Sequence, residues 1–346
     1  MTLQIGVMAS GTDERFLDYA REAERLGVHS IWTAEFWGVD AFTPLAAIAA
    51  VTDRIMLGTG IAQLGARTPA MLAMNAMGVQ AISNGRFLLG LGASGPQVIE
   101  GWHGVEFSKP VQRTRETIEI VRMIVAGERL AYDGQLYRLP LPDSAGVSIR
   151  SAASVPEIPI YIASLGPANL ALTGELADGW IGNSFFTETA DVFFDQIAHG
   201  ASIAGRRLSD LDLTVAASVE FTDDVAAAGK RHARGYAFTF GAMGSGSTNF
   251  YNNAFARQGF GDDVAEVQRL WRAGDRDAAA DRVPVEIGLG TNLIGPPEVI
   301  RDRMRAYRDC GVTTLRVQPV ADGFDDRVDR LGQLMDLVHE VNAEGR

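Results

Sequence analysis

The stretch from Arg54 to Gly95 decides the fold of this chain. It begins Arg54-Ile-Met-Leu-Gly-Thr-Gly-Ile61 and ends Ser83-Asn-Gly-Arg-Phe-Leu-Leu-Gly-Leu-Gly-Ala-Ser-Gly95, with a helical run from Pro69 between these two segments. Each segment holds a continuous apolar run that finishes in glycines, a pattern typical of parallel strands buried on both faces. Ligands of α/β folds bind at the carboxyl ends of such strands. The stretch therefore predicts a parallel barrel and places bare backbone where a cofactor could approach.

The same strand–helix unit recurs along the chain. We expect eight strands, each followed by a helix, over Leu3–Ala9, Ser30–Thr33, Ile55–Ala62, Arg86–Gly92, Pro159–Ala163, Gly179–Gly182, Leu213–Glu220 and Thr314–Gln318. Eight units joined by right-handed crossovers close into an α/β fold of the (β/α)8 TIM-barrel type. A doubly wound open sheet is the alternative. The chain length, the number of strands and the late last strand favour the barrel.

Two segments depart from this repeat, and we treat both as insertions in a single barrel domain spanning residues 1–346. The first, at about 130–154, contains a hairpin with its turn around Asp133-Gly134. The second, at about 240–290, joins a Gly- and Ser-rich stretch to charged helices. Long insertions in barrels serve either as lids or as surface decoration, and the sequence leaves both possibilities open.

Composition excludes several classes of partner. The chain has 346 residues, is 47% hydrophobic and 21% charged, and carries a formal net charge of −12. Such an acidic balance argues against nucleic acid and against anionic membranes. The single cysteine, Cys310, forms no intrachain disulfide, and the N-terminus lacks the basic start of a signal peptide. We expect a cytoplasmic protein that acts on a small molecule.

Common catalytic constellations are missing from the sequence. The histidines show no metal-ligand spacing, so no metal site is expected, and neither a nucleophile elbow nor a Walker loop occurs. The match of Gly90-Leu-Gly-Ala-Ser-Gly95 to a dinucleotide fingerprint is weak, because it ends a fourth strand and a long loop follows it. A protein with these properties leaves its chemistry to an organic cofactor.

A better anion site is Ala163-Ser-Leu-Gly-Pro-Ala168, which ends one strand and starts a helix. Free backbone N–H groups there, together with the Ser164 hydroxyl, would suit a phosphate. An ordinary turn between strand and helix would have the same sequence.

Aromatic and titratable residues follow two strands at the same end of the predicted barrel. Trp102 and His103 lie in the loop after the fourth strand, and Glu35 and Trp37 follow the second. Such residues combine a large flat surface with groups able to move a proton. Core packing is the alternative, but nearby acidic residues and glycines favour a rim that faces a ligand.

Several motifs together resemble the luciferase-like monooxygenase superfamily. They are Leu57-Gly-Thr-Gly-Ile61 with Ala66-Arg-Thr-Pro69, Ser83-Asn-Gly-Arg86, Lys109-Pro-x-x-Arg-x-Arg-Glu116, Ser164-Leu-Gly-Pro167 and Ala177-Asp-Gly-Trp180. Within the superfamily, the set is similar to the deazaflavin-dependent oxidoreductases that use coenzyme F-420, such as methylenetetrahydromethanopterin reductase. The resemblance covers nearly the whole chain.

This resemblance implies a bacterial-luciferase-like TIM barrel with a deazaflavin at the carboxyl ends of the strands. It also implies a non-proline cis peptide at Gly60-Ile61 behind the ring, and a phosphate tail at Ser164-Leu165-Gly166. Trp37, Trp102 and Trp180 would wall the site, the first two on the substrate side. The full cofactor set comprises Ala9, Thr59, Gly60, Ile61, Gly92, Ser94, Ser164, Leu165, Gly166 and Trp180.

One departure from the family concerns acid–base chemistry. Sugar-phosphate dehydrogenase relatives carry an Asp-His pair after the second strand and a glutamate after the fourth, where this chain has Ala34-Glu35 and Ser94-Gly95. Oxidation of a sugar phosphate is therefore not expected, and Glu35 or His103 becomes the candidate proton donor or acceptor.

The expected function is hydride transfer between C5 of the deazaflavin and a small organic substrate. An FMN-dependent monooxygenase on the same fold is the alternative enzyme. A non-catalytic flavin-binding relative is a third possibility, and that one predicts a truncated barrel. Family analogy suggests a homodimer.

Overall fold

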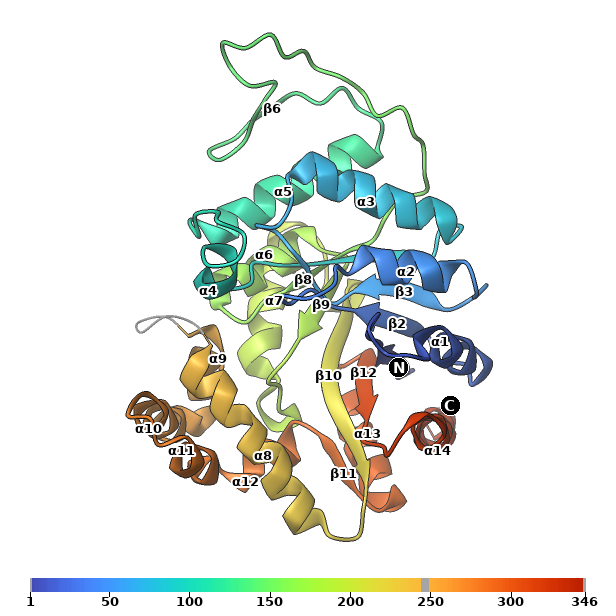
Figure 1. Cartoon of the computed structure of the whole chain (residues 1–346), viewed down its shortest axis with the longest axis vertical. Helices are drawn as coiled ribbons and strands as arrows, with labels where there is room; N and C mark the ends of the chain where they lie inside the picture. The colour runs from blue at the N-terminus through green and yellow to red at the C-terminus, as the bar shows by residue number, and fades with distance from the viewer. Residues whose placement is uncertain (1, 244–248, 345–346) are drawn as a thin grey trace.

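The computed structural model describes residues 2–243 and 249–344. In this part of the chain eight parallel strands close into a barrel (Figure 1), since β9 pairs with β10 and so joins the two ends of the sheet. In order around the barrel they are β1 (Gln4–Met8), β2 (Ser30–Thr33), β3 (Met56–Thr59), β5 (Phe87–Gly92), β8 (Ile160–Ala163), β9 (Gly179–Gly182), β10 (Asp212–Phe221) and β12 (Thr314–Pro319). The predicted TIM barrel is confirmed, and closure excludes the open sheet and the truncated barrel.

Alternate residues of each strand point outward and pack beneath the helices. Ile5, Val7, Leu89, Ile162 and Leu315 belong to this outer core. The helices are α1 (Phe16–Arg25), α2 (Phe42–Ala49), α3 (Pro69–Ile82), α4 (Pro96–Ile99), α5 (Pro110–Val125), α6 (Pro167–Leu176), α7 (Asp191–Ile203), α8 (Val225–Ala242), α13 (Pro297–Cys310) and α14 (Phe324–Ala343). Short 3-10 turns, η1 (Thr187–Thr189) and η2 (Leu208–Asp210), flank α7.

Two short strands extend the barrel. β4 (Ala62–Gln63) continues the third strand after a break at Gly60-Ile61 and pairs with β5. β11 (Leu293–Gly295) pairs with the end of β10 and leads into α13. The sequence reading did not predict β11 and α13, because a three-residue strand gives little periodicity and α13 is rich in charged side chains.

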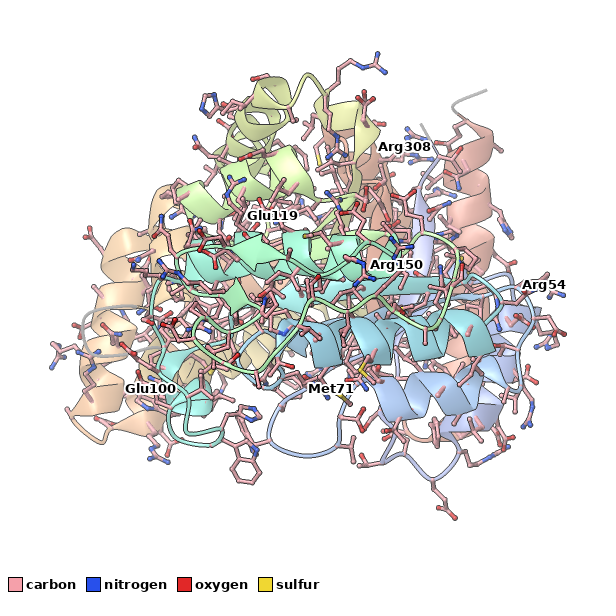
Figure 2. All side chains as sticks on the ribbon, turned by 90° about the horizontal axis from the view of Figure 1, so that it is seen from above. Arg54, Met71, Glu100, Glu119, Arg150 and Arg308 are labelled. Carbon is pink, nitrogen blue, oxygen red and sulfur yellow. The ribbon has the colours of Figure 1, made fainter. Side chains whose placement is uncertain are left out.

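The first insertion forms an arm outside the barrel. Its hairpin, β6 (Tyr132–Asp133) with β7 (Arg138–Leu139), confirms the predicted turn. Backbone N–H groups of the turn donate to the buried Glu116 carboxylate on α5, which anchors the hairpin. Beyond it the chain runs outward past α3 and α5 (Figure 1), and Figure 2 shows the segment that carries Arg150 lying over these helices.

The second insertion builds a helical layer with its own core. It contains the end of α8, then α9 (Phe250–Phe255), a π-helical turn η3 (Ala256–Phe260), α10 (Gly261–Arg272), α11 (Arg276–Arg282) and α12 (Val285–Gly290). Phe240, Phe255, Val267 and Ile287 are buried together there. Residues 244–248 of the predicted Gly- and Ser-rich stretch lie outside the described residues. No helix in the described ranges is long and apolar enough to cross a membrane.

Candidate active site

The barrel interior is filled at its base and lined by small residues near the carboxyl ends of the strands. Trp32, Leu88, Tyr161 and Ile181 pack together and are buried. Higher on the strands the inward-facing positions include Gly60, Ala163, Ala216 and Ser218, which are all partly exposed. Small side chains at the mouth leave room for a flat ligand above a solid floor.

The Gly60–Ile61 peptide bond is cis, at the bond where the family resemblance implied one. Gly60 N donates to Thr33 O at 2.6 Å, and Ile61 O accepts from Glu35 N at 3.1 Å, so the bond is tied to the end of β2. A Cβ on Gly60 would lie 3.5 Å from the Trp32 ring, so this glycine faces the barrel interior.

Two of the predicted cofactor residues, Thr59 and Gly92, make close contacts within the barrel wall. The Thr59 hydroxyl donates to Gly90 O at 2.8 Å and accepts from Gly90 N at 2.9 Å, which links β3 to β5. A Cβ on Gly92 would lie 2.9 Å from the Ile61 side chain, so Gly92 makes room for Ile61. The contact of Thr59 and Gly92 with a cofactor stays a prediction, and both residues are buried.

Ala9 and Ser94 lie at the mouth. Ala9 follows β1 and its N–H donates to Trp32 O at 2.9 Å, while its methyl group packs in the outer core. Ser94 follows β5, is partly exposed and has a φ of 59°. Their contact with a cofactor stays a prediction.

The side chain of Trp180, a predicted wall residue, points away from the barrel interior. Its side chain is fully buried outside the barrel, where it packs against Phe185, Phe193 and Phe194. Trp180 therefore does not line the mouth, which corrects the sequence expectation. Its Nε1 donates to Ser164 O at 2.9 Å, so it supports the loop after β8 from behind.

The loop after β8 exposes backbone donors beside a cation. Leu165 and Gly166 are partly exposed, and in the described ranges their N–H groups make no hydrogen bond. They lie at the amino-terminal end of α6, where partial positive charge accumulates. Arg257 of the second insertion donates to Leu165 O, and its Nε is buried without a partner. Burial lowers the pKa of Arg257 from its ordinary value, as expected for a cation that lacks a counter-charge.

The Ser164 hydroxyl takes no part in this arrangement. It is buried and bonds to Thr173 Oγ1 of α6 at 2.8 Å. An anion bound at this loop would therefore meet backbone N–H groups and Arg257 rather than the side chain of Ser164. Nothing in the sequence distinguishes Arg257 from its charged neighbours, so sequence reasoning missed it.

Glu35 is held by four donors. Its carboxylate accepts from Arg67 Nη2 at 2.6 Å and Nη1 at 2.9 Å, from Gln63 N at 2.9 Å and from Ala41 N at 3.2 Å. The side chain is only 8% exposed. A carboxylate fixed in this way stabilises the loop after β2 and is poorly placed to exchange protons with a substrate. These contacts favour a structural role for Glu35, and its proton-transfer role stays a prediction.

His103 is oriented by Gln63. The Gln63 Nε2 group donates to Glu35 O at 3.0 Å and to Phe36 O at 3.3 Å, so its Oε1 must accept from His103 Nε2, which lies 3.1 Å away. The neutral imidazole then carries its proton on Nε2 and presents Nδ1 as the acceptor. Of the two predicted acid–base residues, His103 retains a nitrogen able to take a proton.

Comparison with known proteins places this site in a family. The sequence profile of the luciferase-like monooxygenase family matches residues 3–314. A putative coenzyme F-420-dependent oxidoreductase from Mycobacterium tuberculosis is 37% identical over 324 residues, covering 91% of this chain and 93% of that protein. The chain belongs to the luciferase-like monooxygenase family.

Other luciferase-like proteins give the same picture. A 5,10-methylenetetrahydromethanopterin reductase from Methanolobus tindarius is 28% identical over 91% of this chain and 93% of its own length. The structure of the coenzyme F-420-dependent tetrahydromethanopterin reductase from Methanopyrus kandleri superposes with a TM-score of 0.80 at 22% identity, covering 98% of this chain and 99% of that one. An F-420-dependent secondary alcohol dehydrogenase has a TM-score of 0.73 at 18% identity, covering 98% and 99% of the two chains. The chain is an oxidoreductase of this family.

The rim of this luciferase-like barrel carries exposed aromatic side chains, and the tryptophans among them are Trp37 and Trp102. Trp37 is 55% exposed and Trp102 is 65% exposed. They follow β2 and α4, in the loops that also hold Glu35 and His103. Both are open to solvent and neither walls an enclosed pocket, so their contact with substrate stays a prediction.

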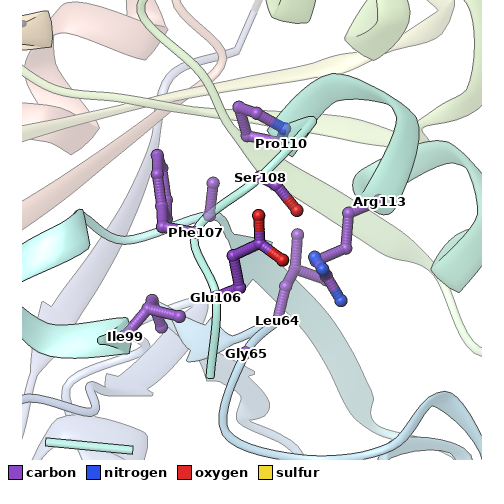
Figure 3. Close-up of a pocket in the computed structure, with 9 residues that line it drawn as sticks. Leu64, Gly65, Ile99, Glu106, Phe107, Ser108, Pro110 and Arg113 are labelled. Carbon is purple, nitrogen blue, oxygen red and sulfur yellow. The ribbon is translucent and has the colours of Figure 1, made fainter. Parts of the chain in front are cut away.

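A small cavity lies beside the mouth but is too small for a cofactor (Figure 3). It is lined by Leu64, Ile99, Phe107, Arg113 and neighbouring residues, and has a volume of about 10 Å³. That is room for about one water molecule. The described ranges contain no group of three or more His, Cys, Asp or Glu that could hold a metal ion.

Proposed function

We propose that this protein is a coenzyme F-420-dependent oxidoreductase that transfers a hydride between C5 of the deazaflavin and a small organic substrate. The observation that carries the proposal is a barrel mouth lined by small residues with an anion site next to it. A flat ring would lie on Gly60, Ile61 and Ala163, and its phosphate tail at Leu165 and Gly166. The relative from Mycobacterium tuberculosis named for coenzyme F-420 supports this choice of cofactor, because it is 37% identical over 91% of this chain.

The residues at the mouth fit such a cofactor. Arg257 is a partly buried guanidinium whose Nε is buried without a partner beside free backbone N–H groups, and a phosphate would satisfy these donors. When bound, the deazaflavin supplies the atom that accepts or donates the hydride. The protein would hold the substrate against it, with Trp37 and Trp102 bounding the substrate side.

His103 would exchange the proton that accompanies hydride transfer. Gln63 fixes its tautomer, so Nδ1 would accept a proton from a substrate hydroxyl during oxidation, or return one during reduction. Gln63 acts through His103 and is a positioning residue. Gln63→Leu should change the pH profile of turnover as well as its rate, because the imidazole loses its acceptor.

Equilibrium binding of F-420, FMN and NADPH to the apo-protein tests the proposal. We expect F-420 to bind tightest, and Arg257→Met to raise its dissociation constant at least tenfold. Arg269→Met is the matched control, since Arg269 lies on α10 of the same insertion, is exposed and pairs with Glu266. Preferential binding of FMN with oxygen-dependent product formation would establish the monooxygenase alternative.

We also propose that the protein acts as a homodimer in the cytoplasm. Apolar side chains exposed on the arm support a partner of the same kind, since a second copy would cover them. The single cysteine, Cys310, fits a reducing compartment.

A further inference from the structure

Arg316 lies inside the barrel and crosses toward its axis. It occupies an inward-facing position of β12, between Leu315 and Val317, which face the outer core. Its Nη2 donates to Gly182 O at 3.2 Å, and its Nη1 lies 3.1 Å from the position a Cβ on Gly60 would take. The side chain therefore reaches from β12 toward β9 and β3, just below the mouth.

This cation has no counter-charge in contact with it. Arg316 is 4% exposed, forms no ion pair with any described residue, and its Nε is buried without a partner. Asp212 is the acidic group that acts on it, but the Asp212 carboxylate already accepts from Tyr161, Thr313 and Thr314. Burial lowers the pKa of Arg316 to about 10, which leaves it charged at neutral pH.

A purely structural arginine in this chain looks different. Arg86 donates to four backbone carbonyls and to the Thr52 hydroxyl, which uses all of its N–H directions. Arg316 makes one such hydrogen bond, and its Cζ lies 5.5 Å from the centroid of the Trp32 ring. An apolar side chain of similar length would fill the same space without the cost of burying an unpaired charge. The charge therefore indicates a ligand that is not a protein side chain.

The open side of Arg316 faces the mouth. Gln318, the next inward-facing residue on β12, is exposed, and Ala216, paired with Arg316 on β10, is partly exposed. Gly60 carries no side chain, and the atom nearest to the position of a Cβ there is Arg316 Nη1, at 3.1 Å. A ligand resting on Gly60 would lie within reach of Nη1.

We propose that Arg316 supplies the counter-charge for the reduced deazaflavin. This inference rests on the proposed function. Hydride transfer to C5 breaks a substrate C–H bond and carries two electrons and one proton into the ring. The substrate is oxidised and its hydroxyl proton leaves to a base, while negative charge spreads to the N1 and C2-carbonyl edge of the ring. Arg316 stabilises that charge and so favours the reduced form over the oxidised one.

Redox titration of the bound cofactor in wild type and Arg316→Met tests this role. We expect the variant to lose at least tenfold in affinity for the reduced form relative to the oxidised form, which places its midpoint potential about 30 mV lower. Arg316→Lys should recover most of the wild-type potential. Arg257→Met is the control. Loss of a phosphate contact should weaken binding of the oxidised and reduced cofactor equally and leave the midpoint potential unchanged.

Two further measurements separate the possible failures. Thermal unfolding of apo Arg316→Met should occur at or above the wild-type temperature, because the variant removes an unpaired buried charge. A variant that no longer folds, or one with the wild-type potential, overturns the inference. Wild-type protein that binds no F-420 contradicts the proposed function itself, and this inference with it.

Discussion

Replacing Glu35 with glutamine should lower stability rather than remove a proton carrier. Each carboxylate oxygen accepts from two donors, one backbone N–H and one Arg67 nitrogen. In either orientation, the amide NH₂ of glutamine would face two of these donors and could accept from neither. Two lost bonds in a mostly buried site, together with a cation left without its charge partner, should cost about 3 kcal/mol.

This cost can be converted into a melting temperature. With an unfolding entropy of about 2.1 cal/mol/K per residue, a chain of 346 residues loses about 4 °C for 3 kcal/mol. Thermal unfolding of the apo-protein, followed by circular dichroism, would measure the shift. Asp18→Asn makes the same chemical change at a carboxylate that pairs with Arg15 and Arg21, where all three side chains are about half exposed, and it should shift the midpoint by about 1 °C or less.

The activity of the same variant decides between the two roles of Glu35. If Glu35 only holds the loop, the pH profile of the remaining turnover keeps its wild-type shape, because His103 still exchanges the proton. Glu35→Gln protein that melts like wild type but loses turnover and one limb of the pH profile would refute this reasoning and restore Glu35 as the acid–base group.

Three other predictions follow from the contacts of single residues. Gly90→Ala should abolish soluble expression, since its Cβ would lie 1.9 Å from Thr59 O, whereas Gly166→Ala has open space and should melt like wild type. Burial alone would raise the pKa of Glu116, but hydrogen bonds from Gln112 and from the hairpin backbone outweigh it and lower that pKa. Its contribution to stability is therefore present at neutral pH and lost as pH falls through the folded-state pKa, and in Glu116→Gln this acid-dependent loss should shrink while proteolysis of the arm at pH 7 increases. Val147→Asp with Ile149→Asp should convert a dimer to a monomer in light scattering, because both side chains are about 70% exposed on the arm, while Val299→Asp on α13 should not; a dimer that survives the double substitution excludes the arm as its interface.

The sequence predicts elements well where local signals mark their ends. α3 and α6 begin at Pro69 and Pro167 as predicted, because proline is favoured in the first turn of a helix. The sequence does not predict which side chains of a strand point into the barrel when both faces of the strand are buried. All four residues of β9 are apolar or glycine, so period-two alternation is absent and the outward orientation of Trp180 has no local signal.

The candidate site was predictable only in outline, because its contacts join distant segments. Gln63 meets His103 across 40 residues, and Arg257 meets Leu165 across 92. Arg316 is different, since β12 alternates polar and apolar residues from Thr314 onward. A charged residue at an inward-facing position of a barrel strand is a signal that sequence reasoning can use.

The contacts of Glu35 and Gln63 support the proposed position of the acid–base group at His103. Glu35 follows the second strand and is bound to Arg67 and to the backbone of Gln63. That network also fixes the Gln63 side chain, whose carboxamide orients His103 from the loop after α4. The same loop contact therefore links Glu35 to the residue proposed for proton exchange, His103. A Gln63→Leu variant should therefore affect His103 chemistry without disturbing the Glu35–Arg67 ion pair, whereas Glu35→Gln should weaken that ion pair and leave the Gln63–His103 hydrogen bond in place.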